Sequence, residues 1–129
     1  MTGPVPKKLR QQFADTMLDV GTADPDLVVL IGDITHFMLQ PFAQACPGRF
    51  FNVGICEPTI VSMGAGLAKA GLYPVMHTIA PFLIERSFEQ INSAKITDMS
   101  KVCKIIYRRS AGIQTHLWRI LGNKIFNFF

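Results

Sequence analysis

Residues 27–33 read Leu27-Val28-Val29-Leu30-Ile31-Gly32-Asp33, a continuous aliphatic run that ends in a glycine and an acid. The run is short, rich in β-branched residues and apolar at every position before the glycine. Such runs are typical of strands that are covered on both sides, as in the parallel sheets of α/β proteins. The stretch therefore predicts a buried strand of an α/β fold.

The segments around this run alternate between helical and extended patterns. Apolar residues between positions 6 and 20 recur at helical spacing, and Gly21 is the expected stop. Pro58 suits the first turn of a later helix, and Gly71 suits its end. The predicted elements are helices at 6–20, 37–45, 58–70 and 83–91 and strands at 27–31, 49–53, 73–78 and 102–107. This alternation predicts an α/β fold, a parallel sheet with helices on both faces.

Three residues whose side chains could take part in catalysis or binding follow the predicted strands. Asp33 follows the first strand, Glu57 the second and Phe82 the third. In parallel α/β sheets, ligands bind beyond the carboxyl ends of the strands. The convergence of two acids and an aromatic ring therefore indicates a candidate site at this edge.

The composition points to one small domain, since the chain has 129 residues and a hydrophobic content of 49%. No apolar run reaches the roughly 20 residues that a bilayer helix needs, so we expect no membrane partner. The first ten residues lack the apolar core of a signal peptide. The cysteines Cys46, Cys56 and Cys103 form no CxxC pair. We expect them to be reduced and buried or half-buried, and the protein to be cytoplasmic.

The basic surplus of the chain belongs to its last third. Residues 1–90 hold six basic and eight acidic residues, whereas residues 91–129 hold seven basic and one acidic residue. A basic segment can bind nucleic acid or an anionic membrane. This one contains no recognition motif, so we expect a solvated tail and no nucleic-acid partner.

Several runs carry a family pattern at family-like spacing. They are Arg49-Phe50-Phe51-Asn52-Val53-Gly54-Ile55-Cys56-Glu57-Pro58, Gly64-Ala65-Gly66-Leu67-Ala68, Gly71, Pro74 and Phe82-Leu83-Ile84-Glu85-Arg86-Ser87-Phe88-Glu89-Gln90. Together they resemble the pyrimidine-binding domain of transketolase and deoxyxylulose-phosphate synthase, which are thiamine-diphosphate enzymes. Weaker similarity extends back through the Gly32-Asp33-Ile34 turn, so we predict this domain at residues 1–90. The resemblance implies the thiamine-diphosphate-binding fold.

The resemblance implies a catalytic role for Glu57. Its carboxyl group would hydrogen-bond the aminopyrimidine of thiamine diphosphate and favour the imino tautomer, which deprotonates the cofactor's own thiazolium carbon. Ile55, Cys56 and Pro58 are expected to provide an apolar, partly desolvated setting. From the residues alone, Glu57 could instead cap the helix beginning at Pro58, where a carboxylate gains about 0.3–1 kcal/mol from the helix dipole.

Five other residues are candidates, three of them through the resemblance and two through their side-chain chemistry. Phe82 corresponds to the ring that stacks on the aminopyrimidine, although an ordinary core phenylalanine is the alternative. Asp33 and Ile34 match the turn beside the thiazolium ring; their alternatives are a helix N-cap and a core aliphatic residue. His77 and Arg86 are candidates for contacts to a sugar phosphate. Their alternatives are a structural histidine and a salt bridge.

The chain departs from the family in ways that imply a partner. The Gly-Asp-Gly motif with its following asparagine, which holds diphosphate and magnesium, does not occur. We therefore expect no metal site, and magnesium supplied through a complementary diphosphate-binding subunit in a hetero- or homo-oligomer. Similarity fades after Gln90, so residues 91–129 are predicted as a divergent basic segment at a truncated or altered gene end. The pyrimidine module would then be incomplete.

These features predict a subunit of a split transketolase that transfers a ketol unit between sugar phosphates, with the isolated chain inactive. Asn92-Ser93-Ala94-Lys95 resembles the beta subunit of 2-oxo-acid dehydrogenases, which is the alternative within the same chemistry. A non-catalytic remnant is a further alternative. Missing strands would expose sheet edges, and exposed edges favour association.

Overall fold

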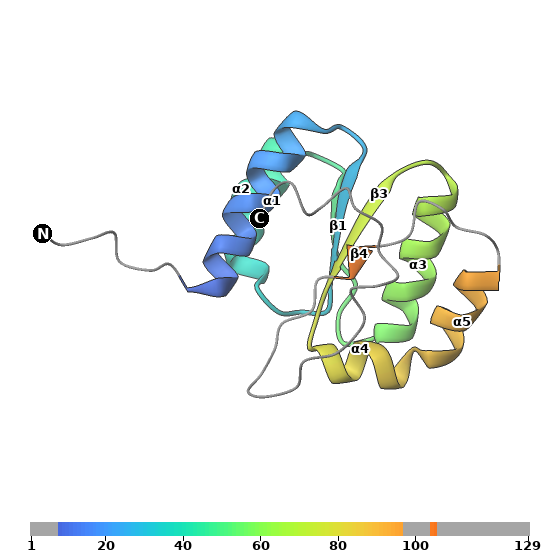
Figure 1. The fold of residues 1–129 in the computed structure, drawn as a ribbon. Coiled ribbons are helices and arrows are strands. Elements are labelled where there is room, and N and C mark those ends of the chain that lie inside the picture. The colour runs from blue at the N-terminus through green and yellow to red at the C-terminus, as the bar shows by residue number, and fades with distance from the viewer. Residues whose placement is uncertain (1–7, 97–103, 106–129) are drawn as a thin grey trace, which may run out of the picture.

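The computed structural model describes residues 8–96 and 104–105. In chain order, the elements are α1 (Leu9–Ala23), β1 (Leu27–Ile31), the 3₁₀-helix η1 (His36–Leu39), α2 (Gln40–Ala45), β2 (Phe50–Asn52), α3 (Glu57–Lys69), β3 (Tyr73–His77), α4 (Ala80–Arg86), α5 (Phe88–Ile96) and β4 (Lys104–Ile105). Figure 1 shows α1 and α2 on one side of the strands, and α3 and α5 on the other.

The strands form one parallel sheet in the order β2-β1-β3-β4. All five residues of β1 are buried. Ile31 pairs with Asn52 on one side and with His77 on the other, so β1, β2 and β3 end at the same level. The predicted α/β fold, a parallel sheet with helices on both faces, is confirmed.

Successive residues of β1 point to opposite faces of the sheet, and each face has its own core. Val29 and Ile31 pack in a cluster with residues of α1, η1 and α2, including Phe42. Leu30 packs in a second cluster, with residues of β3, α3 and α4, including Ile60. Because both faces of the sheet at β1 are covered, every side chain of β1 is buried, which accounts for its uninterrupted aliphatic sequence.

The prediction that Gly21 ends the first helix is wrong. Helix α1 begins at Leu9, continues through Gly21 and ends at Ala23. A Cβ added at Gly21 would collide with the Phe42 ring and lie 3.3 Å from Leu27 Cδ2. The glycine therefore allows close approach of α1 to the core instead of ending the helix.

Helix α3 follows its prediction closely. Pro58 lies in the first turn, where its missing N–H leaves no hydrogen bond unmade. The helix ends at Lys69, and Gly71 adopts a left-handed conformation with φ of +97°. Leu72 N donates to Leu67 O at 3.1 Å, which satisfies a carbonyl of the last turn.

The predicted helix at 83–91 is two helices. α4 begins at Ala80 and α5 at Phe88, and Ser87 breaks the helical path with φ of −113°. α5 runs on past Gln90, the boundary predicted between the domain and the divergent segment. That division stays a prediction, since most of residues 91–129 lie outside the described residues. The predicted strand at 102–107 agrees with β4 in its described part.

The two described cysteines lie in different surroundings. Cys46 is buried in the core and free. Cys56 is also free but exposed, so the expected burial is wrong for this residue. It occupies the N-cap of α3, in a loop beyond the sheet edge. Cys103 lies outside the described residues.

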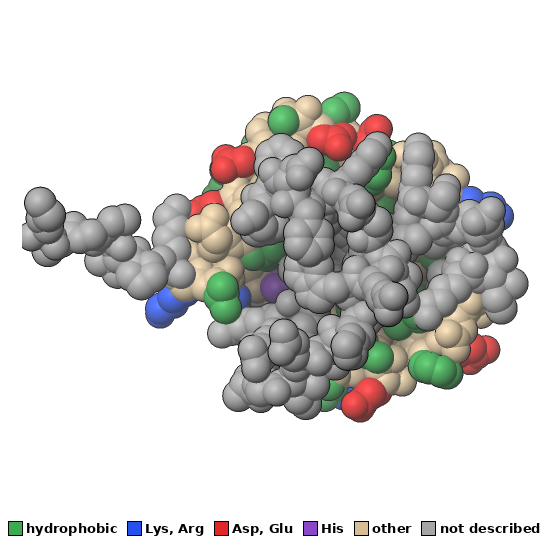
Figure 2. Space-filling model, in the orientation of Figure 1, with side chains coloured by type: hydrophobic (Ala, Val, Ile, Leu, Met, Phe, Trp, Pro, Cys, Tyr) green, Lys and Arg blue, Asp and Glu red, His purple; other side chains and the backbone are tan. Residues whose placement is uncertain are grey.

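Figure 2 shows acidic, basic and hydrophobic side chains interspersed over the visible described surface, with basic groups at scattered points. The basic surplus found in residues 91–129 falls mostly outside this surface. Among residues 8–96 and 104–105, no helix is both long enough and apolar enough to cross a bilayer.

Candidate functional site

The candidate site lies at the edge where β1, β2 and β3 end together. Three segments leave this edge: 32–35 after β1, 53–56 after β2, and 78–79 after β3. Asp33 belongs to the first segment, while Glu57 and Phe82 lie in the first turns of the helices that follow the other two. The expected arrangement at the carboxyl edge is therefore observed.

Gly54 sets the direction in which the chain leaves β2. Its φ of +79° lies in the left-handed region, which favours glycine. Cys56 N donates to Gly54 O at 2.9 Å, and Ile60 N then donates to Cys56 O as α3 begins. This tight turn makes Glu57 the first helical residue.

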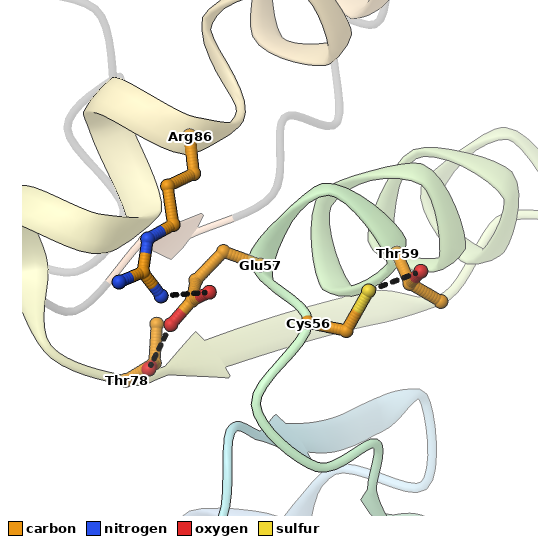
Figure 3. Close-up of polar contacts among 5 residues, drawn as sticks. All are labelled: Cys56, Glu57, Thr59, Thr78 and Arg86. Carbon is orange, nitrogen blue, oxygen red and sulfur yellow. Dashed lines mark hydrogen bonds and ion pairs between the residues drawn. The ribbon is translucent and has the colours of Figure 1, made fainter.

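The Glu57 side chain is 2% exposed and is held by two other elements. Thr78 Oγ1, directly after β3, donates to Glu57 Oε1 at 3.3 Å. Arg86 Nη1, at the end of α4, donates to Glu57 Oε2 at 3.2 Å. Figure 3 shows the carboxylate between these two donors. Its oxygens thus accept from the loop after β3 and from α4, which does not support a role limited to capping α3.

The apolar setting expected from Ile55, Cys56 and Pro58 is observed only in part, since Pro58 alone of the three is half-buried. Ile55 is 72% exposed and Cys56 is exposed as well. The Cys56 thiol instead lies 2.9 Å from Thr59 Oγ1, on the other side of the helix start (Figure 3). Burial of Glu57 therefore comes from elements that are distant in sequence, which the local pattern could not reveal.

Phe82 and Arg86 occupy one face of α4, four residues apart. The Arg86 guanidinium lies over the Phe82 ring, with Cζ 4.0 Å from the ring centroid. Phe82 is 37% exposed, so its ring is not an ordinary core side chain. Arg86 links this aromatic ring to the carboxylate of Glu57.

Asn52, the last residue of β2, joins the first two loops. Its Oδ1 accepts hydrogen bonds from Asp33 N and Gly54 N, each at 3.1 Å. Its Nδ2 donates to Asp33 Oδ1 at 3.1 Å. Asp33 is exposed and has a φ of +60°, a conformation that aspartate tolerates better than most residues. Asn52 therefore positions the Asp33 turn, while Ile34 beside it is half-buried.

His77 lies beneath the loop that follows β1. Its ring is 3% exposed and packs on the Phe13 ring with centroids 4.3 Å apart. Its Nε2 lies 2.7 Å from Thr35 Oγ1. Thr35 has a φ of +63°, so this hydrogen bond supports a strained turn. These contacts give His77 a structural role, and its contact with a sugar phosphate stays a prediction.

Two residues of the site were not identified from the sequence. Thr78 and Asn52 each hold a predicted site residue, Glu57 and Asp33 respectively. Each stands at the carboxyl end of a strand, a position that could have indicated them. Within residues 8–96 and 104–105, His, Cys, Asp and Glu side chains form no group that could hold a metal ion.

Comparison with known proteins assigns this arrangement to a family. The sequence profile described as "Transketolase, pyrimidine binding domain" matches residues 6–116. The match covers most of the chain and extends past Gln90.

Individual relatives share a shorter segment. An uncharacterized 33.6 kDa protein in the fasciation locus of Rhodococcoides fascians is 43% identical over 79 residues, 61% of this chain and 25% of that protein. The 1-deoxy-D-xylulose-5-phosphate synthase 1 of Kitasatospora griseola is 45% identical over 80 residues, 61% of this chain and 12% of that enzyme. The corresponding synthase of Syntrophus aciditrophicus is 37% identical over 89 residues, 68% of this chain and 14% of that enzyme.

The chain thus spans a quarter or less of these curated relatives. The family profile nevertheless covers the described sheet, its flanking helices and the candidate site at the carboxyl edge. The chain belongs to the transketolase pyrimidine-binding domain family, a family of thiamine-diphosphate enzymes.

Proposed function

We propose that this chain supplies the pyrimidine-binding half of a thiamine-diphosphate site in a transketolase-type transferase acting on sugar phosphates. The observation that carries the proposal is the pairing of a buried carboxylate, Glu57, with a partly exposed aromatic ring, Phe82. Both side chains contact the same guanidinium, that of Arg86. A flat heterocycle with a ring nitrogen matches these two groups.

The described residues fit an aminopyrimidine ring. An ionised carboxylate offers about four lone-pair positions, and the donors Thr78 and Arg86 use one each. Glu57 therefore keeps acceptor capacity for a ring N–H, which the pyrimidine offers when that nitrogen carries a proton, as in the imino tautomer. Offset stacking on Phe82 would add about 0.5–1.5 kcal/mol beyond the burial of surface.

When bound, the cofactor would supply a nucleophilic thiazolium carbon toward the carbonyl group of the donor sugar. In this proposal, Glu57 hydrogen-bonds the pyrimidine nitrogen and sets the tautomer, while Phe82 fixes the plane of the ring. Asp33 and Ile34 would lie beside the thiazolium ring. Asn52 supports this role because it holds the Asp33 turn through hydrogen bonds at 3.1 Å.

The proposed site requires a second domain. The described residues offer no cluster of metal ligands, so magnesium and the diphosphate contacts are assigned to a complementary diphosphate-binding subunit or domain. Activity would then belong to an oligomer and not to the isolated chain.

The curated relatives favour one specific variant of this chemistry. Two relatives 45% and 37% identical are 1-deoxy-D-xylulose-5-phosphate synthases. We therefore name formation of 1-deoxy-D-xylulose 5-phosphate as the second candidate reaction beside ketol transfer between sugar phosphates. Both reactions require the same pyrimidine half-site.

The decisive experiment compares Glu57→Gln with a matched control, Glu85→Gln, on an exposed position of α4. The full chain and the protein encoded by its genomic neighbour are mixed with thiamine diphosphate and magnesium. Cofactor binding is followed by calorimetry, and ketol transfer and synthase activity by product analysis. Glu57→Gln should lower the rate about 100-fold or more, in the range of lost acid–base groups, while Glu85→Gln should match wild type. Undiminished activity of Glu57→Gln would refute the role of Glu57, and a lack of cofactor binding in every mixture would favour a non-catalytic remnant.

A further inference from the structure

Arg86 stands between the two groups that define the proposed site. Its side chain is 49% exposed, whereas the Glu57 carboxylate that it contacts is 2% exposed. Figure 3 shows Arg86 extending from α4 toward Glu57, with Thr78 on the opposite side of the carboxylate. The guanidinium therefore holds Glu57 from α4, while the hydroxyl of Thr78 holds it from the sheet.

The same guanidinium covers one face of the Phe82 ring at 4.0 Å from its centroid. Arginine over an aromatic face is an attractive arrangement, and it fixes the ring against the cation. A ligand that stacks on Phe82 must then use the opposite face. Arg86 thereby sets both the plane of the ring and its position relative to the carboxylate.

We propose that Arg86 is a positioning residue that holds Glu57 and Phe82 in register for the pyrimidine, and that it does not bind the sugar phosphate. The inference rests on the proposed function. The guanidinium is already engaged by Glu57 through Nη1 and by Phe82 through its face. Removing it would leave the buried Glu57 carboxylate without its cationic partner, which is strongly unfavourable. A planar guanidinium, unlike an ammonium group, can lie flat on a ring while donating to a carboxylate.

The test uses the cofactor-binding preparation of the preceding experiment, with Arg86→Met, Arg86→Lys, Glu57→Gln and the double variant Glu57→Gln/Arg86→Met. Affinity for thiamine diphosphate is measured by calorimetry, and KM for the sugar phosphate by steady-state kinetics. Urea unfolding of each full chain reports folding. Arg86→Met should weaken cofactor binding about tenfold, the size of a coupling between contacting residues. The affinity of Arg86→Lys for thiamine diphosphate should lie between those of Arg86→Met and wild type. If Arg86→Met does not fold, Arg86→Lys alone provides the test.

Non-additivity separates positioning from a merely structural effect. Because part of the effect of Arg86 runs through Glu57, its loss should weaken cofactor binding clearly less than about tenfold once Glu57 is already glutamine; the remaining loss reports its contact with Phe82. KM for the sugar phosphate should stay at the wild-type value. An equal loss of cofactor affinity in both backgrounds, or a raised KM with unchanged cofactor affinity, would overturn the inference alone. Failure of the wild-type preparation to bind thiamine diphosphate would instead overturn the proposed function, and the inference with it.

Discussion

Gly32, the residue that follows β1, has no room for a side chain. An alanine Cβ at this position would lie 2.7 Å from Thr78 Oγ1, 3.1 Å from Thr78 Cβ and 3.1 Å from Ile60 Cδ1. Thr78 is buried and β-branched, so its χ1 angle resists adjustment. Ile60 is fully buried in the core between the sheet and α3. Gly32→Ala should therefore destabilise the protein by about 1–3 kcal/mol, the usual cost of overpacking.

Urea unfolding of the full chain at one fixed temperature measures this loss. With an m-value of about 1–3 kcal/mol/M for a small protein, the midpoint should fall by about 1 M. Gly66→Ala is the matched control, because a Cβ there meets no atom within 4 Å and the residue lies inside α3. That change should stabilise the protein by about 0.5–1 kcal/mol, since alanine loses less entropy in a helix than glycine.

A wild-type midpoint for Gly32→Ala would refute the packing described at this edge. A second check adds Thr78→Ala, which removes the atom nearest to the new Cβ. The stability losses of Gly32→Ala and Thr78→Ala, added together, should exceed the loss of the double variant. The reason is that removing the Thr78 hydroxyl and methyl group makes room for the Cβ that Gly32→Ala adds. Strict additivity would mean that the two residues do not compete for the same space.

Two further substitutions test contacts away from Gly32. Arg49→Met should destabilise by about 1–3 kcal/mol, because Arg49 donates to the carbonyls of Gly21 at 2.8 Å and of Asp24 at 2.7 Å; urea unfolding measures the loss, and a wild-type midpoint would contradict it. Asn52→Asp should destabilise through repulsion from Asp33, whose Oδ1 now accepts from Asn52. High salt should shrink this loss of stability, and a loss that is independent of salt would exclude repulsion as its cause.

Much of the fold could be predicted because its signals are local. The aliphatic run of β1 reflects burial on two faces, and Pro58 and Gly71 mark the ends of α3 through their own backbone preferences. The prediction at Gly21 was wrong because the glycine is needed to make room for the Phe42 ring, a contact between distant residues that no local pattern indicates. The break between α4 and α5 at Ser87 carries no proline or glycine, so no local breaker indicated it.

Several candidate residues of the site could be named from the sequence, but Thr78, Asn52 and the contacts among the side chains could not. Glu57, Phe82 and Arg86 were identified through the family pattern, yet that pattern does not state that one guanidinium contacts the other two. Of the apolar neighbours expected around Glu57, Ile55 and Cys56 are exposed and Pro58 is half-buried. The donors to its carboxylate come from the residue after β3 and from α4. Such contacts depend on how α3 and α4 pack on the sheet, which is a property of tertiary structure.

This dependence makes stability and site geometry inseparable at the carboxyl edge. Gly32 leaves space for Thr78, and Thr78 holds one oxygen of Glu57. Displacing Thr78 through Gly32→Ala should therefore weaken the proposed pyrimidine contact as well as the fold. Gly66→Ala changes stability without touching any partner of Glu57, so its cofactor affinity should equal that of wild type. The two variants change stability in opposite directions, so a loss of affinity shared by both would exclude the displaced hydroxyl as its cause. A loss confined to Gly32→Ala is the expected result.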